Sequence, residues 1–218
     1  MELAHALVDE LRRTAPVHTV ILYGSRARGD ATPDSDLDVA AFADVATTTR
    51  DARRWRGLYL DGFVYPTAVA TAAPDAELLK LRGGTVLLDE RGLAGPLMAA
   101  LDALHGAGPP PITDDDRQMR RVWAHKMLAR IARDDIEAHY RRHWLLYQLL
   151  EDHFAYAGAW YLGPKRALAA LAIDAPALHA AFAAALAPGA DLPTIAALVA
   201  QVCGPDGPLD GPVDGPDR

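Results

Sequence analysis

The chain has 218 residues, of which 50% are hydrophobic and 23% charged, and its formal net charge is −7. This length suffices to bury the core of one large domain or of two modest ones. The acidic balance and the lack of a Lys/Arg block argue against broad electrostatic attraction to nucleic acid or to an anionic membrane. The single cysteine, Cys203, excludes an intrachain disulfide and a Cys-based zinc site.

Residues 2–14 are predicted to form an amphipathic helix that packs on a sheet. The segment is acidic where a signal peptide would be basic, and no apolar run in the sequence approaches membrane-spanning length. These features predict a cytoplasmic protein with no membrane partner.

A strand, a turn and an acidic strand follow. The apolar run over residues 17–23 has the β-branched and aromatic content of a buried strand, and it ends abruptly at Gly24-Ser25. Glycine permits a tight turn, and serine adds a hydroxyl donor beside free backbone N–H groups. A second strand is predicted over residues 36–43, where alternation places Asp36 and Asp38 on one face. Two carboxylates on an otherwise apolar strand need a partner, and a divalent cation such as Mg²⁺ is the obvious one.

Gly24-Ser25, ten intervening residues and then Asp36-Leu37-Asp38 resemble the signature of DNA polymerase β-type nucleotidyltransferases. The resemblance implies that Gly24 and Ser25 bind the triphosphate of ATP or another NTP. It also implies that Asp36 and Asp38 hold two Mg²⁺ ions, with help from a third carboxylate on a later strand. One ion would activate an acceptor hydroxyl while the other stabilises the pyrophosphate leaving group.

Asp61, in the strand-like run over residues 58–65, is the best candidate for that third carboxylate. By the resemblance it would complete the metal site and take the proton from the acceptor hydroxyl. Because Asp-Gly is a strong turn dipeptide, the alternative is that Asp61-Gly62 is the turn of a hairpin. Asp89, after a predicted strand at residues 85–88, is the reserve candidate.

The pattern changes once along the chain. A helix is predicted at residues 93–104, and the run Gly106-Ala-Gly-Pro-Pro-Pro111 then ends the alternation of helices and strands. Ala/Leu-rich helical spacing begins after this run, with a helix predicted from about Thr113 to Tyr140. The predicted fold is α+β, a small mixed sheet with flanking helices followed by an all-α helical bundle. The predicted parts are a catalytic domain, a linker, a substrate- or nucleotide-binding bundle and a disordered Asp-Gly-Pro-rich tail, at residues 1–105, 106–112, 113–203 and 204–218.

Two features of the helical half bear on substrate binding. Gly163-Pro164 predicts a helix start, and Lys165 in its first turn is a candidate for binding the triphosphate. Trp144, Tyr147 and Glu151 share one face with Phe154, which is either core or an acceptor pocket in which Glu151 is a second candidate base.

The arrangement of a catalytic domain before a helical bundle resembles the small-molecule nucleotidyltransferases, such as aminoglycoside adenylyltransferases. We therefore predict Mg²⁺-dependent transfer of an NMP, with AMP as the expected group, to a hydroxyl of a small molecule, without a nucleic-acid partner. A nucleotidyltransferase antitoxin that modifies a protein partner is one alternative. A fused HEPN-type ribonuclease, carried by Arg133 and His139, is another, and a non-catalytic nucleotide-binding module is a third.

Overall fold

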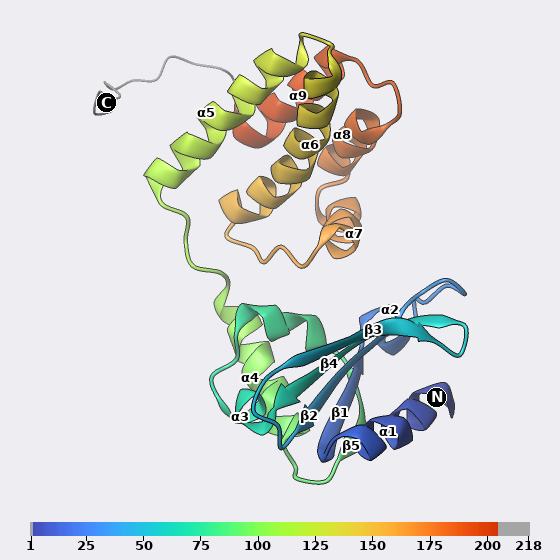
Figure 1. Ribbon diagram of the computed structural model, residues 1–218. Coiled ribbons are helices and arrows are strands. Elements are labelled where there is room, and N and C mark those ends of the chain that lie inside the picture. Colours follow the sequence, from blue (N-terminus) through green and yellow to red (C-terminus); the bar gives the residue numbers. More distant parts are fainter. Residues whose placement is uncertain (1, 205–218) are drawn as a thin grey trace, which may run out of the picture. The chain divides into compact units, whose positions relative to one another are not determined.

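The computed structural model describes residues 2–204, and the chain divides between Ala107 and Gly108 into two compact units (Figure 1). The predicted α+β class is confirmed, because a five-stranded sheet lies in the first unit and helices build the second. The predicted disordered tail lies outside the described residues, apart from Gly204. Among the helices in residues 2–204, none combines the length and the apolar character that crossing a membrane requires.

The N-terminal unit is a mixed sheet with helices around it. The sheet order is β3-β4-β2-β1-β5, in which β2 and β4 run parallel and the other neighbours run antiparallel. The elements are α1 (Glu2–Thr14), β1 (Val17–Tyr23), α2 (Gly24–Arg28), β2 (Leu37–Ala43), β3 (Thr49–Trp55), β4 (Leu58–Pro66), α3 (Thr67–Thr71), the 3₁₀ helix η1 (Ala76–Leu81), β5 (Thr85–Asp89) and α4 (Ala94–Ala107).

The four predicted strands and both predicted helices of this unit are present, whereas β3 and the short helices α2, α3 and η1 were not predicted. Strand β3 has the sequence Thr-Arg-Asp-Ala-Arg-Arg-Trp and exposes most of its side chains. It pairs only with β4, at the edge of the sheet, so it needs no apolar alternation. Helix α4 continues through Gly106 to Ala107, two residues into the predicted linker.

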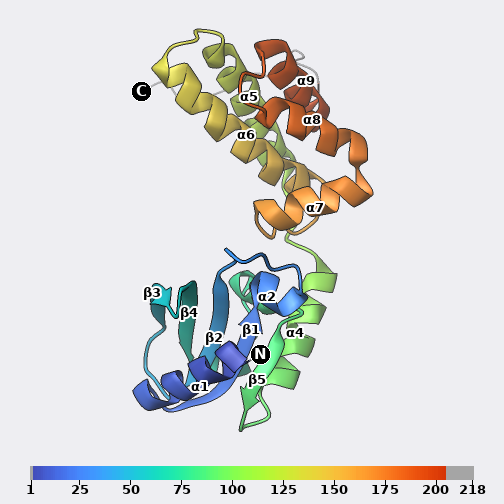
Figure 2. The same cartoon turned by 90° about the vertical axis from the view of Figure 1, so that its right-hand side faces the viewer.

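One part of the core of this unit lies between α1 and one face of the sheet. Leu7, Val8 and Leu11 of α1 are buried in a cluster with Val39 and Leu60. These positions alternate along the strands with the residues of the opposite face, where Asp38 lies. Figure 2 shows α1 and α4 on different sides of the sheet. The opposite face is packed as well, because Ile21 and Phe42 of the strands, Leu79 of η1 and Leu97 of α4 are all buried, and Asp38 lies at one end of this face.

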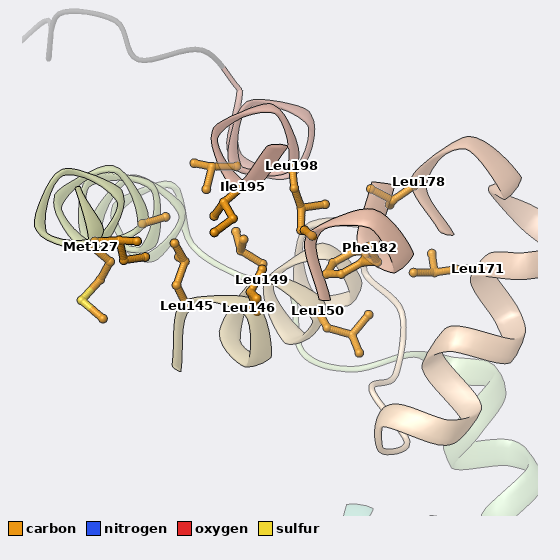
Figure 3. Close-up of a cluster of buried hydrophobic side chains, with 14 of the residues drawn as sticks. Met127, Leu145, Leu146, Leu149, Leu150, Leu171, Leu178, Phe182, Ile195 and Leu198 are labelled. Atoms are coloured by element: carbon orange, nitrogen blue, oxygen red, sulfur yellow. The ribbon is translucent and has the colours of Figure 1, made fainter. Parts of the chain in front are cut away.

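The second unit consists, within the described residues, of α5 (Asp114–Ile131), α6 (Ile136–Tyr156), α7 (Pro164–Asp174), α8 (Pro176–Leu186) and α9 (Leu192–Cys203). Leu145 and Leu149 of α6 lie at the centre of its core, with Phe182 and Ile195 from α8 and α9 (Figure 3). The prediction of a single helix from Thr113 to Tyr140 is wrong, because this segment is divided between α5 and α6.

The break between α5 and α6 has a local cause. Asp134 adopts a left-handed backbone with φ 53°, and the Asp135 carboxylate then accepts a hydrogen bond from the backbone N–H of Ala138 at 2.8 Å. Asp135 is therefore the N-cap of a new helix.

Candidate active site

The pairing of three strands brings two of the acidic candidates, Asp38 and Asp61, side by side. Asp38 at the start of β2 pairs with Tyr23 at the end of β1, and on its other side with Asp61 of the parallel strand β4. Residues paired in this way point to the same face of the sheet. Asp61 lies inside a nine-residue strand, so the hairpin-turn interpretation of Asp61-Gly62 is wrong.

Gly24 lies directly against the Asp38 carboxylate. Its φ is +73°, and a Cβ atom placed on it would come within 1.9 Å of Asp38 Oδ2. Only glycine accepts both this backbone angle and this contact. The buried residue Ser25 follows in the first turn of α2. The Gly-Ser turn and the acidic strand, which are separate motifs in the sequence, thus form one contact in the structure.

Arg26 fastens the loop that leads to the acidic strand. Its Nη2 donates to the Ser35 carbonyl at 2.7 Å, and its Nε lies 3.1 Å from the carbonyl oxygens of both Ser35 and Asp36. Asp36 itself is exposed and immediately precedes β2. Sequence analysis missed the role of Arg26, although its place after Gly-Ser in a fixed-length loop was a signal.

At the Asp38 carboxyl, burial and the neighbouring acids outweigh the positive charges of Arg28 and Lys80. Burial raises the pKa of the Asp38 carboxyl, and the neighbouring Asp36 and Asp61 raise it further. Burial, Asp38 and Asp61 likewise raise the pKa of the Tyr23 hydroxyl, so this phenol stays protonated. A bound cation would relieve the repulsion among the three carboxylates.

Asp61 is engaged by an arginine of the neighbouring strand. Arg50 Nε donates to Asp61 Oδ1 at 2.8 Å. Within residues 2–204, no group of three or more acidic, histidine or cysteine side chains is gathered as a ready-made metal cage. Mg²⁺ takes only one or two carboxylates when waters and substrate phosphates complete its shell, so Asp36 and Asp38 fit it as donors. A metal-binding role for Asp61 stays a prediction.

A lysine and aromatic rings complete this face of the sheet. Lys80, from η1, points its ammonium at the rings of Tyr23, Phe63 and Tyr65. Burial raises the pKa of Tyr65 to about 12. Sequence analysis did not single out Lys80, because a lone lysine in an irregular segment carries no pattern.

The reserve carboxylate, Asp89, has a structural role and is not part of the site. Its two oxygens accept hydrogen bonds from the backbone N–H groups of Leu93 and Ala94, at 3.0 and 3.1 Å, and Thr19 donates to it at 3.2 Å. Burial alone would raise the pKa of Asp89, but these bonds outweigh it and the pKa is lowered. Asp89 thus binds the backbone where α4 begins, which overturns the reserve assignment.

The predicted residues of the second unit lie on α6 and α7. Lys165 is exposed in the first turn of α7, as expected. Trp144 and Tyr147 are 46% and 54% exposed, so this part of the aromatic row is not core. Glu151 accepts a hydrogen bond from Gln148 at 3.3 Å.

The residues of the ribonuclease hypothesis are both bound by nearby acids. Arg133 donates to Asp135 at 2.7 Å, and His139 lies 3.0 Å from an oxygen of Asp134. These contacts give each of the two side chains a local partner and do not join them.

Comparison with known proteins finds a family match within the first unit. A family model described as nucleotidyltransferase domain matches residues 5–80, which include Gly24, Asp38 and Asp61. A nucleotidyltransferase-like protein from Exiguobacterium sibiricum has a solved structure similar to this chain, at 13% identity and a TM-score of 0.40, covering 91% of this chain and 74% of that one. A search of curated proteins found no match. Residues 5–80 therefore form a nucleotidyltransferase domain of the DNA polymerase β-type superfamily.

Proposed function

We propose that this protein transfers a nucleoside monophosphate, expected to be AMP, from an NTP to a hydroxyl of a small molecule and releases pyrophosphate. The observation that carries the proposal is the contact between Gly24 and the Asp38 carboxylate, with Asp61 beside it on the parallel strand. This geometry is the reason to assign the chemistry of the matched domain to these particular residues.

In this proposal the Gly24-Ser25 turn binds the triphosphate. Lys165 of α7, in the second unit, stays a sequence-based candidate for binding phosphate. Asp36 and Asp38 would hold Mg²⁺, with Asp61 as a further ligand. The metal, when bound, supplies charge neutralisation at the reacting phosphate and at the leaving pyrophosphate. The half-buried Asp38 is suited to this role because its negative charge is poorly solvated and lies beside two other acids.

Asp61 is the proposed general base. To take a proton, its carboxylate must come within hydrogen-bond reach of the acceptor hydroxyl. Its Oδ1 accepts the bond from Arg50, which orients the carboxylate, while Oδ2 is the candidate to receive the proton. Glu151 is the second candidate base, and comparing Asp61→Asn with Glu151→Gln in a pyrophosphate-release assay separates the two.

The first test measures binding without an acceptor. Thermal unfolding is followed with each NTP, with and without Mg²⁺, for the wild type and for the Asp36→Asn/Asp38→Asn variant. We expect Mg²⁺-dependent stabilisation by at least one NTP in the wild type and none in the variant. Stabilisation that survives the double substitution would show that these carboxylates are not the metal site.

The second test identifies the acceptor. Pyrophosphate release is screened with aminoglycosides, other hydroxylated small molecules and protein candidates. Release that depends on a small hydroxylated compound supports the proposal, whereas transfer of label from NTP to a protein would favour the antitoxin-like alternative.

A further inference from the structure

Lys80 is the one lysine in residues 1–107 of the sequence, and aromatic rings surround its ammonium. The ammonium nitrogen lies 3.8 Å from the centre of the Phe63 ring, and 5.7 Å and 5.9 Å from the ring centres of Tyr23 and Tyr65. The three rings come from two strands, while Lys80 itself comes from η1. Several separate elements therefore hold one partly buried cation in place.

The position of these rings puts Lys80 beside the acidic pair. Phe63 is two residues from Asp61 on β4, and Tyr23 is paired directly with Asp38. Alternate residues of a strand lie about 7 Å apart on the same face. The ammonium is thus about one residue row from the carboxylates that the proposed function assigns to the metal.

A second cation shares the Phe63 ring. The guanidinium carbon of Arg50 lies 5.4 Å from the ring centre, and Arg50 also holds Asp61. Burial lowers the pKa of Lys80 and the charge of Arg50 acts in the same direction, while the carboxylates of Asp61, Glu77 and Asp38 raise it. If Mg²⁺ takes up the charge of Asp38 and Asp61, as the proposed function assigns, a phosphate oxygen beside Lys80 and Arg50 would offset the repulsion between these two cations.

We propose that Lys80 binds a non-bridging phosphate oxygen of the nucleoside triphosphate. This inference rests on the proposed function and adds to it a phosphate-binding residue from the first unit. A lysine suits the task because its ammonium is a compact charge with three rotatable donors. The aromatic rings hold it without consuming its charge, since a cation–π contact leaves the ammonium able to donate hydrogen bonds.

Substitution gives the first test. ATP affinity is measured by calorimetry with Mg²⁺ for Lys80→Met and Lys80→Arg. Loss of a charge-assisted hydrogen bond predicts affinity about 10- to 100-fold weaker for Lys80→Met, with most of it kept by Lys80→Arg. The matched control is Arg82→Gln, which removes a cation two residues away that binds Asp102, and it should bind ATP like the wild type. If Lys80→Met binds ATP as tightly as the wild type, Lys80 only packs against the rings and the proposal is wrong.

Labelling of the unmodified protein gives a test that does not depend on how a variant folds. Lysines are acetylated with a small amine-reactive ester in the presence and absence of Mg²⁺ and saturating ATP, and each site is quantified by mass spectrometry. We expect ATP to slow acetylation of Lys80 several-fold and to leave Lys126, an exposed residue of α5, unchanged. Equal labelling of Lys80 while calorimetry detects ATP binding would refute the role of Lys80 alone. Absence of ATP binding to the wild type would refute the proposed function together with it.

Discussion

Replacing Gly24 with alanine tests the contact on which the active site is built. Alanine in a left-handed backbone costs about 1–2 kcal/mol. The added Cβ would also meet Asp38 Oδ2 at 1.9 Å, so the carboxylate must rotate away, which costs roughly a further 0.5–1.5 kcal/mol if no relaxed rotamer receives it. We therefore expect Gly24→Ala to lower the free energy of unfolding by about 1.5–3.5 kcal/mol.

Gly29→Ala is a matched control in the same loop. Gly29 has a similar φ of +82°, but a Cβ there would meet no atom within 4 Å. Its cost is the backbone term alone, about 1–2 kcal/mol. The difference between the two variants in urea denaturation isolates the displacement of the Asp38 carboxylate.

Nucleotide binding gives a functional readout for the same two variants, Gly24→Ala and Gly29→Ala. At an ATP concentration of 100 times Kd, the wild type should gain about 2.7 kcal/mol of stability in the presence of Mg²⁺. A hundredfold loss of affinity in Gly24→Ala leaves a gain of about 0.4 kcal/mol, while Gly29→Ala should keep nearly the whole gain. If Gly24→Ala retained the wild-type gain, the Asp38 position fixed by this contact would not matter for nucleotide binding.

Three further outcomes follow from the charges and contacts. Arg26→Met, which frees the loop before Asp36, should weaken Mg²⁺-dependent ATP binding about tenfold by calorimetry, with little change in melting temperature. The pKa of Asp38 is raised in the folded state, so the folded protein holds a proton that the unfolded chain has released. Stability without metal should therefore fall as pH rises above about 4. Asp36→Asn should lower the Asp38 pKa in an NMR titration, and an unchanged pKa would contradict the assigned repulsion. In the second unit, Arg120→Ala leaves the fully buried Asp152 without its ion-pair partner and should cost about 3 kcal/mol in urea denaturation, whereas the double variant with Asp152→Leu should recover most of that loss.

The parts of the fold that the sequence predicts are those with a periodic apolar face. Strands β1, β2 and β4 are buried against α1, and their burial is visible in the sequence as a high content of apolar residues. Strand β3 escaped prediction because it lies at the sheet edge, where charged residues such as Arg50 and Arg53 are tolerated and useful. The break between α5 and α6 was missed because charged residues are compatible with a helix interior, and only the capping role of Asp135 distinguishes the two.

For the candidate site, residue types were predictable and partners were not. Asp38 could be chosen because acids on an apolar strand are costly, and Asp61 because the resemblance calls for a third carboxylate on a later strand. Their adjacency follows from the parallel pairing of β2 and β4, which depends on the whole sheet. Asp89 has the same local signal as Asp61, an acid at a strand-like run. Its carboxylate instead binds the first backbone N–H groups of α4, and only the three-dimensional contact separates the two roles.

The ten-residue gap between the Gly-Ser turn and the acidic strand has a physical explanation in this fold. Antiparallel pairing places the end of β1 opposite the start of β2, so the chain between them must leave the sheet and return to the same edge. Helix α2 carries it outward, and Arg26 binds the returning loop through the carbonyl oxygens of Ser35 and Asp36. A shorter loop could not contain both the helical turn and the segment that Arg26 holds. A longer one would cost ordering entropy at the point where Asp36 must be placed. The spacing is therefore the length at which Gly24 can contact the Asp38 carboxylate while Asp36 stays next to Asp38.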